Sequence, residues 1–88
     1  MLTDQELEKL RRLLVEQHKW PSEYIFKFIV PQDRVRDVEK LFPGHSIKKR
    51  ASRRGKFIGL TVRIHMESAD VVIAVYQQAS RIPGLLSL

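Results

Sequence analysis

The chain of 88 residues contains no cysteine, no asparagine and no long apolar segment. Without cysteine, the protein has no disulfide, no thiol chemistry and no thiolate to offer a metal ion. No apolar run approaches the ~18 residues that a membrane-spanning helix requires. The first residues, up to Glu6, are polar and acidic, unlike those of a signal peptide. We therefore expect a cytoplasmic protein without a membrane segment.

Acidic residues are scarce in the second half of the chain. Residues 1–44 carry eight Lys or Arg and eight Asp or Glu, whereas residues 45–88 carry eight Lys or Arg against two Asp or Glu. The net charge of +6 therefore arises entirely in the second half. Seven basic residues lie between Lys48 and Arg63, with no acidic residue among them. Because net charge bears on partners and solubility, this run predicts one basic surface facing an anion or an acidic partner.

The first residues carry the signature of a helix. At this length the chain forms one domain with a thin core, which a partner can supplement. Thr3 followed by Glu6 is typical of a capping box, and Pro21 disfavours helical structure just before it. A helix is therefore predicted over 3–18, with leucines at helical spacing on one face: Leu7, Leu10 and Leu14.

The rest of the chain alternates between strand and helix patterns. Residues 23–30 are rich in aromatic and β-branched residues and present one wholly apolar face. Pro43 and Gly44 end a second helix. The inward-facing residues of the first strand are Tyr24, Phe26, Phe28 and Val30. The predicted strands are 23–30, 46–52, 56–67 and 85–88, and the predicted helices after the first are 32–42 and 69–81.

One segment is ambiguous between the two patterns. Residues 71–76 have strong β propensity. We favour a helix because Ser68 or Asp70 can cap it and because the long strand before it otherwise lacks a cover. The order after the first helix is then β-α-β-β-α-β, which is the ferredoxin-like arrangement: an α+β fold with an antiparallel sheet and two helices on one face. We expect an N-terminal amphipathic helix at 1–19 and this domain at 20–88.

Three short motifs in this order resemble a known family. They are Trp20–Ile29 in the first strand, Ser52–Phe57 in the hairpin, and Val75–Leu85 in the closing helix and strand. Over about residues 20–88 the chain resembles the YbeD-like family of small uncharacterised bacterial proteins. The resemblance implies an ACT-like regulatory domain and a role near lipoate metabolism. ACT domains that bind amino acids often use a glycine in the turn after the first strand. Residues 30–33 contain none, which argues against such a site here.

The basic run is the main candidate site. Strand alternation places Lys48 and Arg50 on the outer sheet face, beside Arg63 and His65 of the next strand. The basic residues of the turn lie at the rim of that face. The candidate anion- or partner-binding residues are Lys48, Arg50, Arg53, Arg54, Lys56 and Arg63. The alternative interpretation is a solvated edge whose charge keeps the protein soluble and discourages further pairing.

Aromatic residues are few on this face. Recognition of RNA by a ferredoxin-like sheet normally requires paired aromatics for base stacking. Lys56 and Ile58 occupy the positions where the RNA-recognition motif has aromatics, and only Phe57 is aromatic on the outer face. This pattern disfavours recognition of a specific base sequence in single-stranded RNA, and it leaves contact with the nucleic-acid backbone possible.

Apolar residues are also expected on the outer face, at Ile25, Ile29 and Phe57. Apolar groups in such a position indicate that something covers them. The N-terminal helix is one candidate cover and a second subunit is the other. We therefore expect self-association as a homodimer.

No catalytic or metal-binding pattern accompanies these features. The fold's acylphosphatases need an asparagine and a glycine-rich loop, and its copper chaperones need paired cysteines; both patterns are missing. His18, His45 and His65 lie on separate elements without ligand spacing. We therefore predict no catalytic residue, no cofactor and no metal. The sequence favours a non-enzymatic regulatory or adaptor module of ACT-like type that binds a protein partner or a small anionic ligand. The alternative is a nucleic-acid-binding module that uses the basic hairpin and the outer sheet face.

Overall fold

The computed structural model describes residues 3–88. The predicted order of helices and strands is confirmed, and residues 71–76 are helical. The helices are α1 (Asp4–Gln17), η1 (Gln32–Arg34, a 3-10 turn), α2 (Val35–Glu39) and α3 (Ala69–Ala79), and the strands are β1 (Ser22–Pro31), β2 (Lys48–Ala51), β3 (Phe57–Met66) and β4 (Leu86–Ser87).

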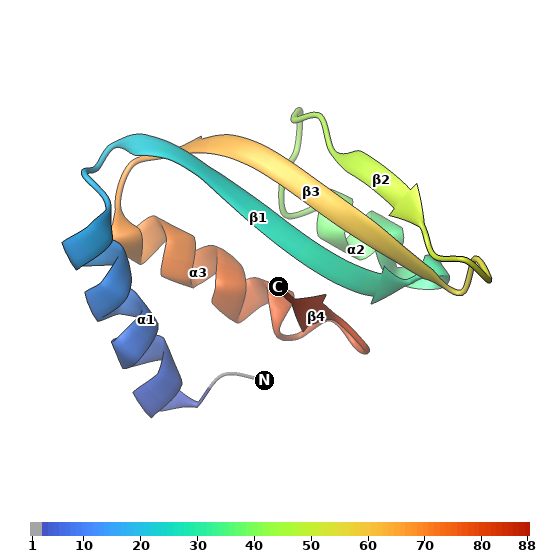
Figure 1. The fold of residues 1–88 in the computed structure, drawn as a ribbon, viewed down its shortest axis with the longest axis horizontal. Helices are drawn as coiled ribbons and strands as arrows, with labels where there is room; N and C mark the ends of the chain where they lie inside the picture. Colours follow the sequence, from blue (N-terminus) through green and yellow to red (C-terminus); the bar gives the residue numbers. More distant parts are fainter. Residues whose placement is uncertain (1–2) are drawn as a thin grey trace.

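The strands form one antiparallel sheet in the order β2-β3-β1-β4. Its centre is the pair β1 and β3, which runs for ten residues from Ser22 opposite Met66 to Pro31 opposite Phe57. Helices α2 and α3 lie on the same side of this sheet (Figure 1). This arrangement confirms the ferredoxin-like α+β fold.

The core lies between the sheet and the helices. Residues directly opposite each other in an antiparallel pair share a face, so Phe26 faces the helices with Val62, and Phe28 with Leu60. These four side chains are almost completely buried, as is Val38 of α2. Alternation along β1 and β3 therefore predicted the inner face correctly. The other buried apolar residues are Leu14, Val30, Phe42, Met66, Ala69, Val72, Ile73, Tyr76 and Ala79.

Helix α1 begins with the predicted capping box. The Thr3 hydroxyl accepts a hydrogen bond from the Glu6 amide at 3.2 Å, and the Glu6 carboxylate accepts one from the Thr3 amide at 3.1 Å. The leucine stripe then packs on the core of the same chain, with Leu14 buried and Leu7 and Leu10 partly buried. The capping box and the stripe were both readable from the sequence.

The prediction that α1 could cover the outer sheet face is wrong. Helix α1 packs against α3 on the helix side of the sheet (Figure 1). Arg11 forms an ion pair with Asp70 of α3 at 3.2 Å, and the Trp20 indole donates a hydrogen bond to the Leu14 carbonyl at 3.1 Å. The apolar flank of α3 is therefore what the leucine stripe covers, and the sheet's other face stays free of α1.

The helix predicted over 32–42 is shorter and tighter than expected. It consists of the 3-10 turn η1 and the five-residue α2, and no side chain caps the amino end of either. Beyond α2, the Leu41 and Phe42 amides each bond to a carbonyl three residues earlier. Without a cap, and with Pro43 close behind, the segment keeps only one regular helical turn.

The two edge strands are also shorter than predicted. Strand β2 covers 48–51 rather than 46–52, and β4 covers 86–87 rather than 85–88. Backbone bonds extend both slightly, from the Ser52 amide to the Phe57 carbonyl and from the Leu88 amide to the Lys27 carbonyl. Within residues 3–88, no helix has both the length and the apolar character needed to cross a membrane.

The position of α1 predicts how neighbouring leucines tolerate truncation. Leu14 is 4% exposed and Leu13 is 46% exposed. Leu14→Ala should lower the free energy of unfolding by about 2–4 kcal/mol because it empties a packed site. Leu13→Ala should change it by no more than about 0.5 kcal/mol. Urea denaturation of both variants measures this, and equal losses would contradict the packing of α1 on α3.

Candidate functional site: the outer sheet face

The outer face is the side of the sheet opposite α2 and α3. The strand register arranges its side chains in rows that cross all four strands. One row runs from Arg50 through Gly59 and Ile29 to Leu86. The next row runs from Lys48 through Thr61 and Lys27 toward Leu88, whose amide bonds to the Lys27 carbonyl.

Apolar side chains are exposed on this face, as predicted for Ile25 and Phe57. The carboxyl-terminal strand adds more, because Leu86 is 60% exposed and Leu88 is 73% exposed. No element within residues 3–88 covers them. Ile29, also predicted here, is half-buried between them, and we call the whole set the apolar strip: Ile25, Ile29, Phe57, Leu86 and Leu88.

Basic side chains border the apolar strip. Lys48 and Arg50 lie opposite Thr61 and Gly59, which confirms that they face outward. Lys27 joins them from β1. Across the described chain, none of these three has a carboxylate within 4.0 Å. We call Lys27, Lys48 and Arg50 the basic rim.

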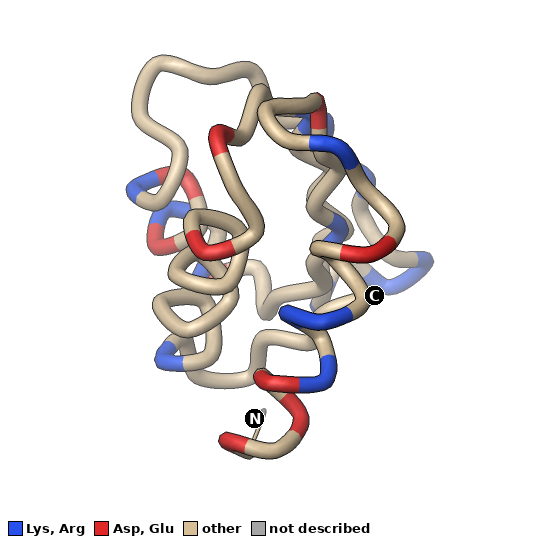
Figure 2. The backbone as a smooth tube through the Cα atoms, turned by 90° about the vertical axis from the view of Figure 1, so that its left-hand side faces the viewer, with Lys and Arg blue, Asp and Glu red and all other residues tan. Residues whose placement is uncertain are grey.

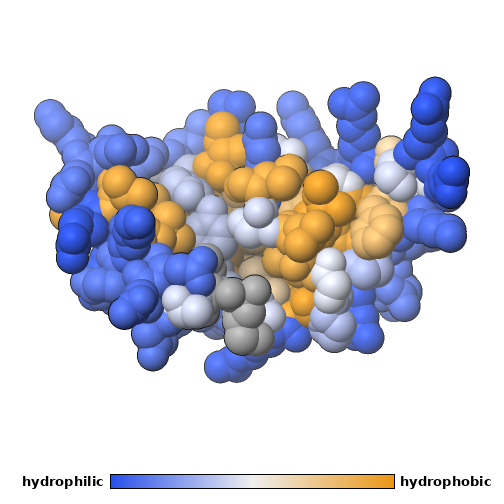
Figure 3. All heavy atoms as spheres, turned by 60° about the horizontal axis from the view of Figure 1, so that its bottom comes forward, coloured by the Kyte–Doolittle hydropathy of each residue, from blue (hydrophilic) through white to orange (hydrophobic). Residues whose placement is uncertain are grey.

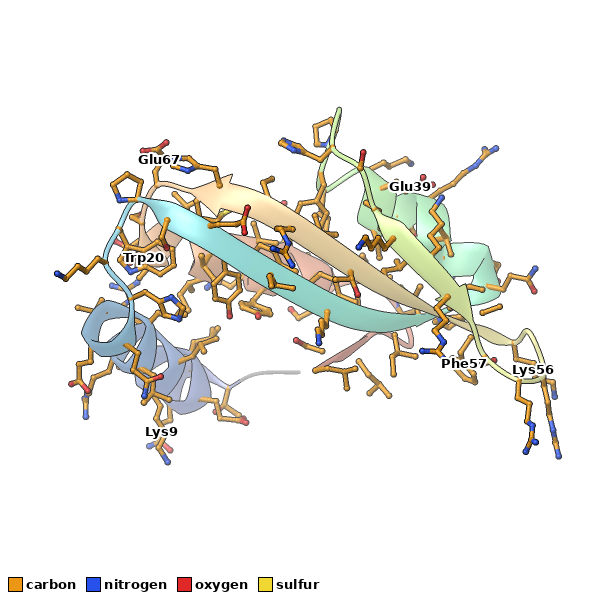
Figure 4. All side chains as sticks on the ribbon, turned by 45° about the horizontal axis from the view of Figure 1, so that its top comes forward. Lys9, Trp20, Glu39, Lys56, Phe57 and Glu67 are labelled. Carbon is orange, nitrogen blue, oxygen red and sulfur yellow. The ribbon has the colours of Figure 1, made fainter. Side chains whose placement is uncertain are left out.

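The hairpin between β2 and β3 carries the next group of predicted residues. Arg53, Arg54 and Lys56 are exposed in this turn and, within residues 3–88, none forms an ion pair. Figure 4 shows Lys56 beside Phe57 at the far end of the sheet from Trp20. Gly55 supplies the positive φ of 70° that the turn requires. The hairpin therefore extends the positive charge of the basic rim along one end of the molecule.

Arg63 differs from the other predicted residues. Its guanidinium pairs with the Glu23 carboxylate of β1 at 3.3 Å, and both side chains are exposed. Glu67, the nearest acid in sequence, instead lies 3.2 Å from His65. Exposed pairs of this kind contribute little stability, but they lower the local positive potential. As far as residues 3–88 show, five of the six predicted residues have no carboxylate partner, and the sixth, Arg63, is paired.

Lys49 shows how alternation divides the basic run. Its neighbours in β2 face outward, whereas Lys49 lies opposite the buried Leu60. There it pairs with Glu39 of α2 at 3.0 Å (Figure 4). Lys49 therefore connects β2 to α2, and its charge is paired with Glu39 on the helix side of the sheet.

A shallow depression of about 510 Å³ lies in the middle of the outer face. Gly59 and Thr61 form its floor, the basic rim stands along its sides, and Ile29 and Leu88 give it apolar walls. Sequence reasoning missed Lys27, Gly59, Leu86 and Leu88. The available signal was Gly59 itself, since a glycine inside a strand often marks a close approach by a ligand or another chain.

Two groups with shifted pKa values, Glu6 and Tyr76, lie away from this face. Hydrogen bonds from the Thr3 backbone and side chain lower the pKa of the Glu6 carboxyl. Burial raises the pKa of the Tyr76 hydroxyl, and its contact with the Tyr24 hydroxyl at 2.9 Å raises it further. Over residues 3–88, no three His, Cys, Asp or Glu side chains gather into a group that could hold a metal ion.

Other surfaces carry mixed charge. Figure 2 views the molecule from the α1 end, where acidic and basic residues alternate along the nearest elements. Figure 3 brings the lower edge of Figure 1 forward, where an apolar patch over α1 is surrounded by hydrophilic side chains and a second one near β4 belongs to the apolar strip. Within residues 3–88, by contrast, the basic rim and the basic residues of the hairpin form no ion pair.

The sequence was compared with models of known protein families, with curated proteins and with solved structures. A family model described as "Protein of unknown function (DUF493)" matches residues 16–87. The chain belongs to the DUF493 family. These are the YbeD-like small bacterial proteins, so the resemblance carried by the Trp20–Ile29, Ser52–Phe57 and Val75–Leu85 motifs is confirmed. No curated protein and no solved structure matched the chain.

The geometry of Gly59 predicts that the domain tolerates a side chain there. A Cβ atom at Gly59 would lie 3.6 Å from the Arg50 carbonyl, which is ordinary contact, and its φ is not positive. Gly59→Val should therefore keep the free energy of unfolding or raise it by up to about 1 kcal/mol, because valine favours strands. Gly84→Val is the contrasting variant.

Gly84 has φ of 77°, and a Cβ atom there would lie 2.7 Å from Pro31. Gly84→Val should therefore destabilise the fold clearly. Thermal unfolding followed by circular dichroism compares the two variants. A loss of stability in Gly59→Val similar to that in Gly84→Val would contradict the open floor of the depression.

Proposed function

We propose that this protein is a non-enzymatic regulatory or adaptor module of the cytoplasm that binds an acidic protein partner through its outer face. The observation that supports this proposal is the meeting of two features on one surface. Among the described residues, Lys48 and Arg50 have no carboxylate partner; they lie beside the apolar strip, and the hairpin basic residues continue their charge. Protein interfaces combine apolar contact with complementary charge in this way.

The extent of the basic surface favours a macromolecule over a small anionic ligand. Lys48 and Arg50 lie about 7 Å apart along β2, at roughly 3.3 Å per residue, and Arg53, Arg54 and Lys56 in the turn beyond it extend the basic surface further. A small anion would contact two or three of them. An acidic polypeptide segment can contact both the basic rim and the hairpin.

A second copy of the chain fits this face poorly. Two outer faces brought together would place the Lys27, Lys48 and Arg50 side chains of both copies in one interface, and like charges in an interface are costly. The leucine stripe of α1 is already covered within the chain. Self-association stays a prediction, tested by light scattering at micromolar concentration, and like charge disfavours the outer face as its contact.

Nucleic acid is the alternative partner, because its phosphates also match a basic hairpin. Among the described residues, Phe57 is the one aromatic side chain exposed on the outer face. Binding of single strands normally uses several stacking aromatics. We therefore rank an acidic protein above nucleic acid.

Charge reversal at the hairpin tests the proposal. Wild-type protein should bind poly-L-glutamate, and its affinity should fall steeply as salt screens the charges. Arg53→Glu combined with Arg54→Glu should remove this binding while the thermal unfolding midpoint stays nearly unchanged, because both residues are exposed. The control is Arg36→Glu combined with Lys40→Glu, which makes the same charge change on or beside α2 and should retain binding.

Duplex DNA and single-stranded RNA serve as competing probes in the same titrations. The proposal requires that they bind more weakly than poly-L-glutamate at equal salt. Tighter binding to nucleic acid would favour the alternative function. If wild-type protein bound none of these probes at low salt, both the acidic-protein function and the nucleic-acid function would be contradicted.

A further inference from the structure

We infer that the outer face recognises an acidic segment by one apolar anchor side chain, which inserts over Gly59 between the basic side chains. This inference rests on the proposed function and adds the chemistry of the partner. Three features of the outer face support it: a trough that can hold the anchor side chain, a glycine that creates the trough, and basic side chains that can contact the acidic residues on either side of the anchor.

The place is a trough along β3. The depression over Gly59 and Thr61 continues into a second one of about 230 Å³ toward Phe57 and Ser52. Both are lined by three residues of a single row: Ile29, Arg50 and Gly59. The two depressions therefore meet above Gly59.

The trough exists because Gly59 has no side chain to fill the space above β3. Arg50 stands on one side of it in β2 and Ile29 on the other side in β1. Neither backbone conformation nor crowding requires glycine, because φ is not positive and an added Cβ would meet nothing closer than 3.6 Å. A glycine inside a central strand weakens it, so its presence here calls for another explanation. The space that a side chain would fill is the trough itself.

The lining of the trough fits one kind of occupant. Ile29, Leu88 and Phe57 offer apolar contact within and beside it, and the basic rim stands next to these groups. An aliphatic or aromatic side chain would bury its surface against the apolar residues. Carboxylates on either side of it in the partner's sequence would then lie near Lys27, Lys48 and Arg50. The matching partner segment is an apolar residue flanked by acidic residues.

Synthetic peptides of the form Glu-Glu-Ser-X-Ser-Glu-Glu test the anchor, with X as Phe, Leu or Ala. Fluorescence anisotropy measures their affinity for the intact protein. Wild type should bind the Phe and Leu peptides about tenfold or more tightly than the Ala peptide, because burial of a large apolar side chain contributes on that scale.

Two variants separate the anchor from the charge. Gly59→Val fills the trough and should abolish the preference for Phe and Leu over Ala while binding of the Ala peptide persists. Arg53→Glu combined with Arg54→Glu should weaken all three peptides and retain the preference. His65→Val is the matched control for Gly59→Val. It replaces the imidazole with the same valine side chain, in β3 on the same face but outside the trough, and it should leave the preference intact.

The outcomes distinguish the inference from the proposed function. The anchor inference would be wrong if wild type bound the three peptides with equal affinity, or if Gly59→Val kept the preference for Phe and Leu. In either case, charge-dependent binding of the peptides would still support the proposed function. Failure of wild type to bind any of the peptides would overturn both. Loss of the preference in Gly59→Val but not in His65→Val, with both folded by circular dichroism, supports the anchor.

Discussion

The pairing of β1 with β3 over ten residues organises this domain. Because side chains alternate with a period of two, this one register buries Phe26 and Phe28 against the helices and turns Lys27 and Ile29 outward. A slip by one residue would expose the whole core face. The hydrophobic core and the candidate site are therefore two consequences of the same pairing. The site keeps its geometry as long as the core is intact, which is why outer-face substitutions are informative about binding.

The sheet could be predicted from sequence because its signals are local. Alternation identified both faces of β1 and β3, and a capping residue at Ser68 outweighed the β propensity of Val71 to Tyr76. The Ser68 hydroxyl indeed accepts a hydrogen bond from the Val71 amide at 3.2 Å. The position of α1 could not be predicted, because an amphipathic stripe shows that a helix is covered and does not show by what. Its packing on α3 depends on contacts distant in sequence, such as Arg11 with Asp70.

The candidate site was predicted only in part, because some of its residues come together through contacts that are distant in sequence. The run of basic residues identified Lys48, Arg50 and the hairpin, and strand alternation gave their direction. The pairing of Arg63 with Glu23 escaped prediction because the two residues lie forty positions apart and meet only through the register. Leu86 and Leu88 joined the outer face only once β4 was known to pair with β1. Gly59 became meaningful when the side chains on both sides of it were known.

We propose that the outer face, which no described element covers, is the binding surface of this DUF493 protein. Amide chemical-shift mapping by NMR, with an acidic peptide that carries one central phenylalanine, tests it most directly. Binding at the outer face should give shifts concentrated at Arg50, Gly59 and Thr61 and at the neighbouring positions of β1, with α3 nearly unaffected. Shifts confined to α1 and α3, or spread evenly over all exposed lysines and arginines, would contradict it.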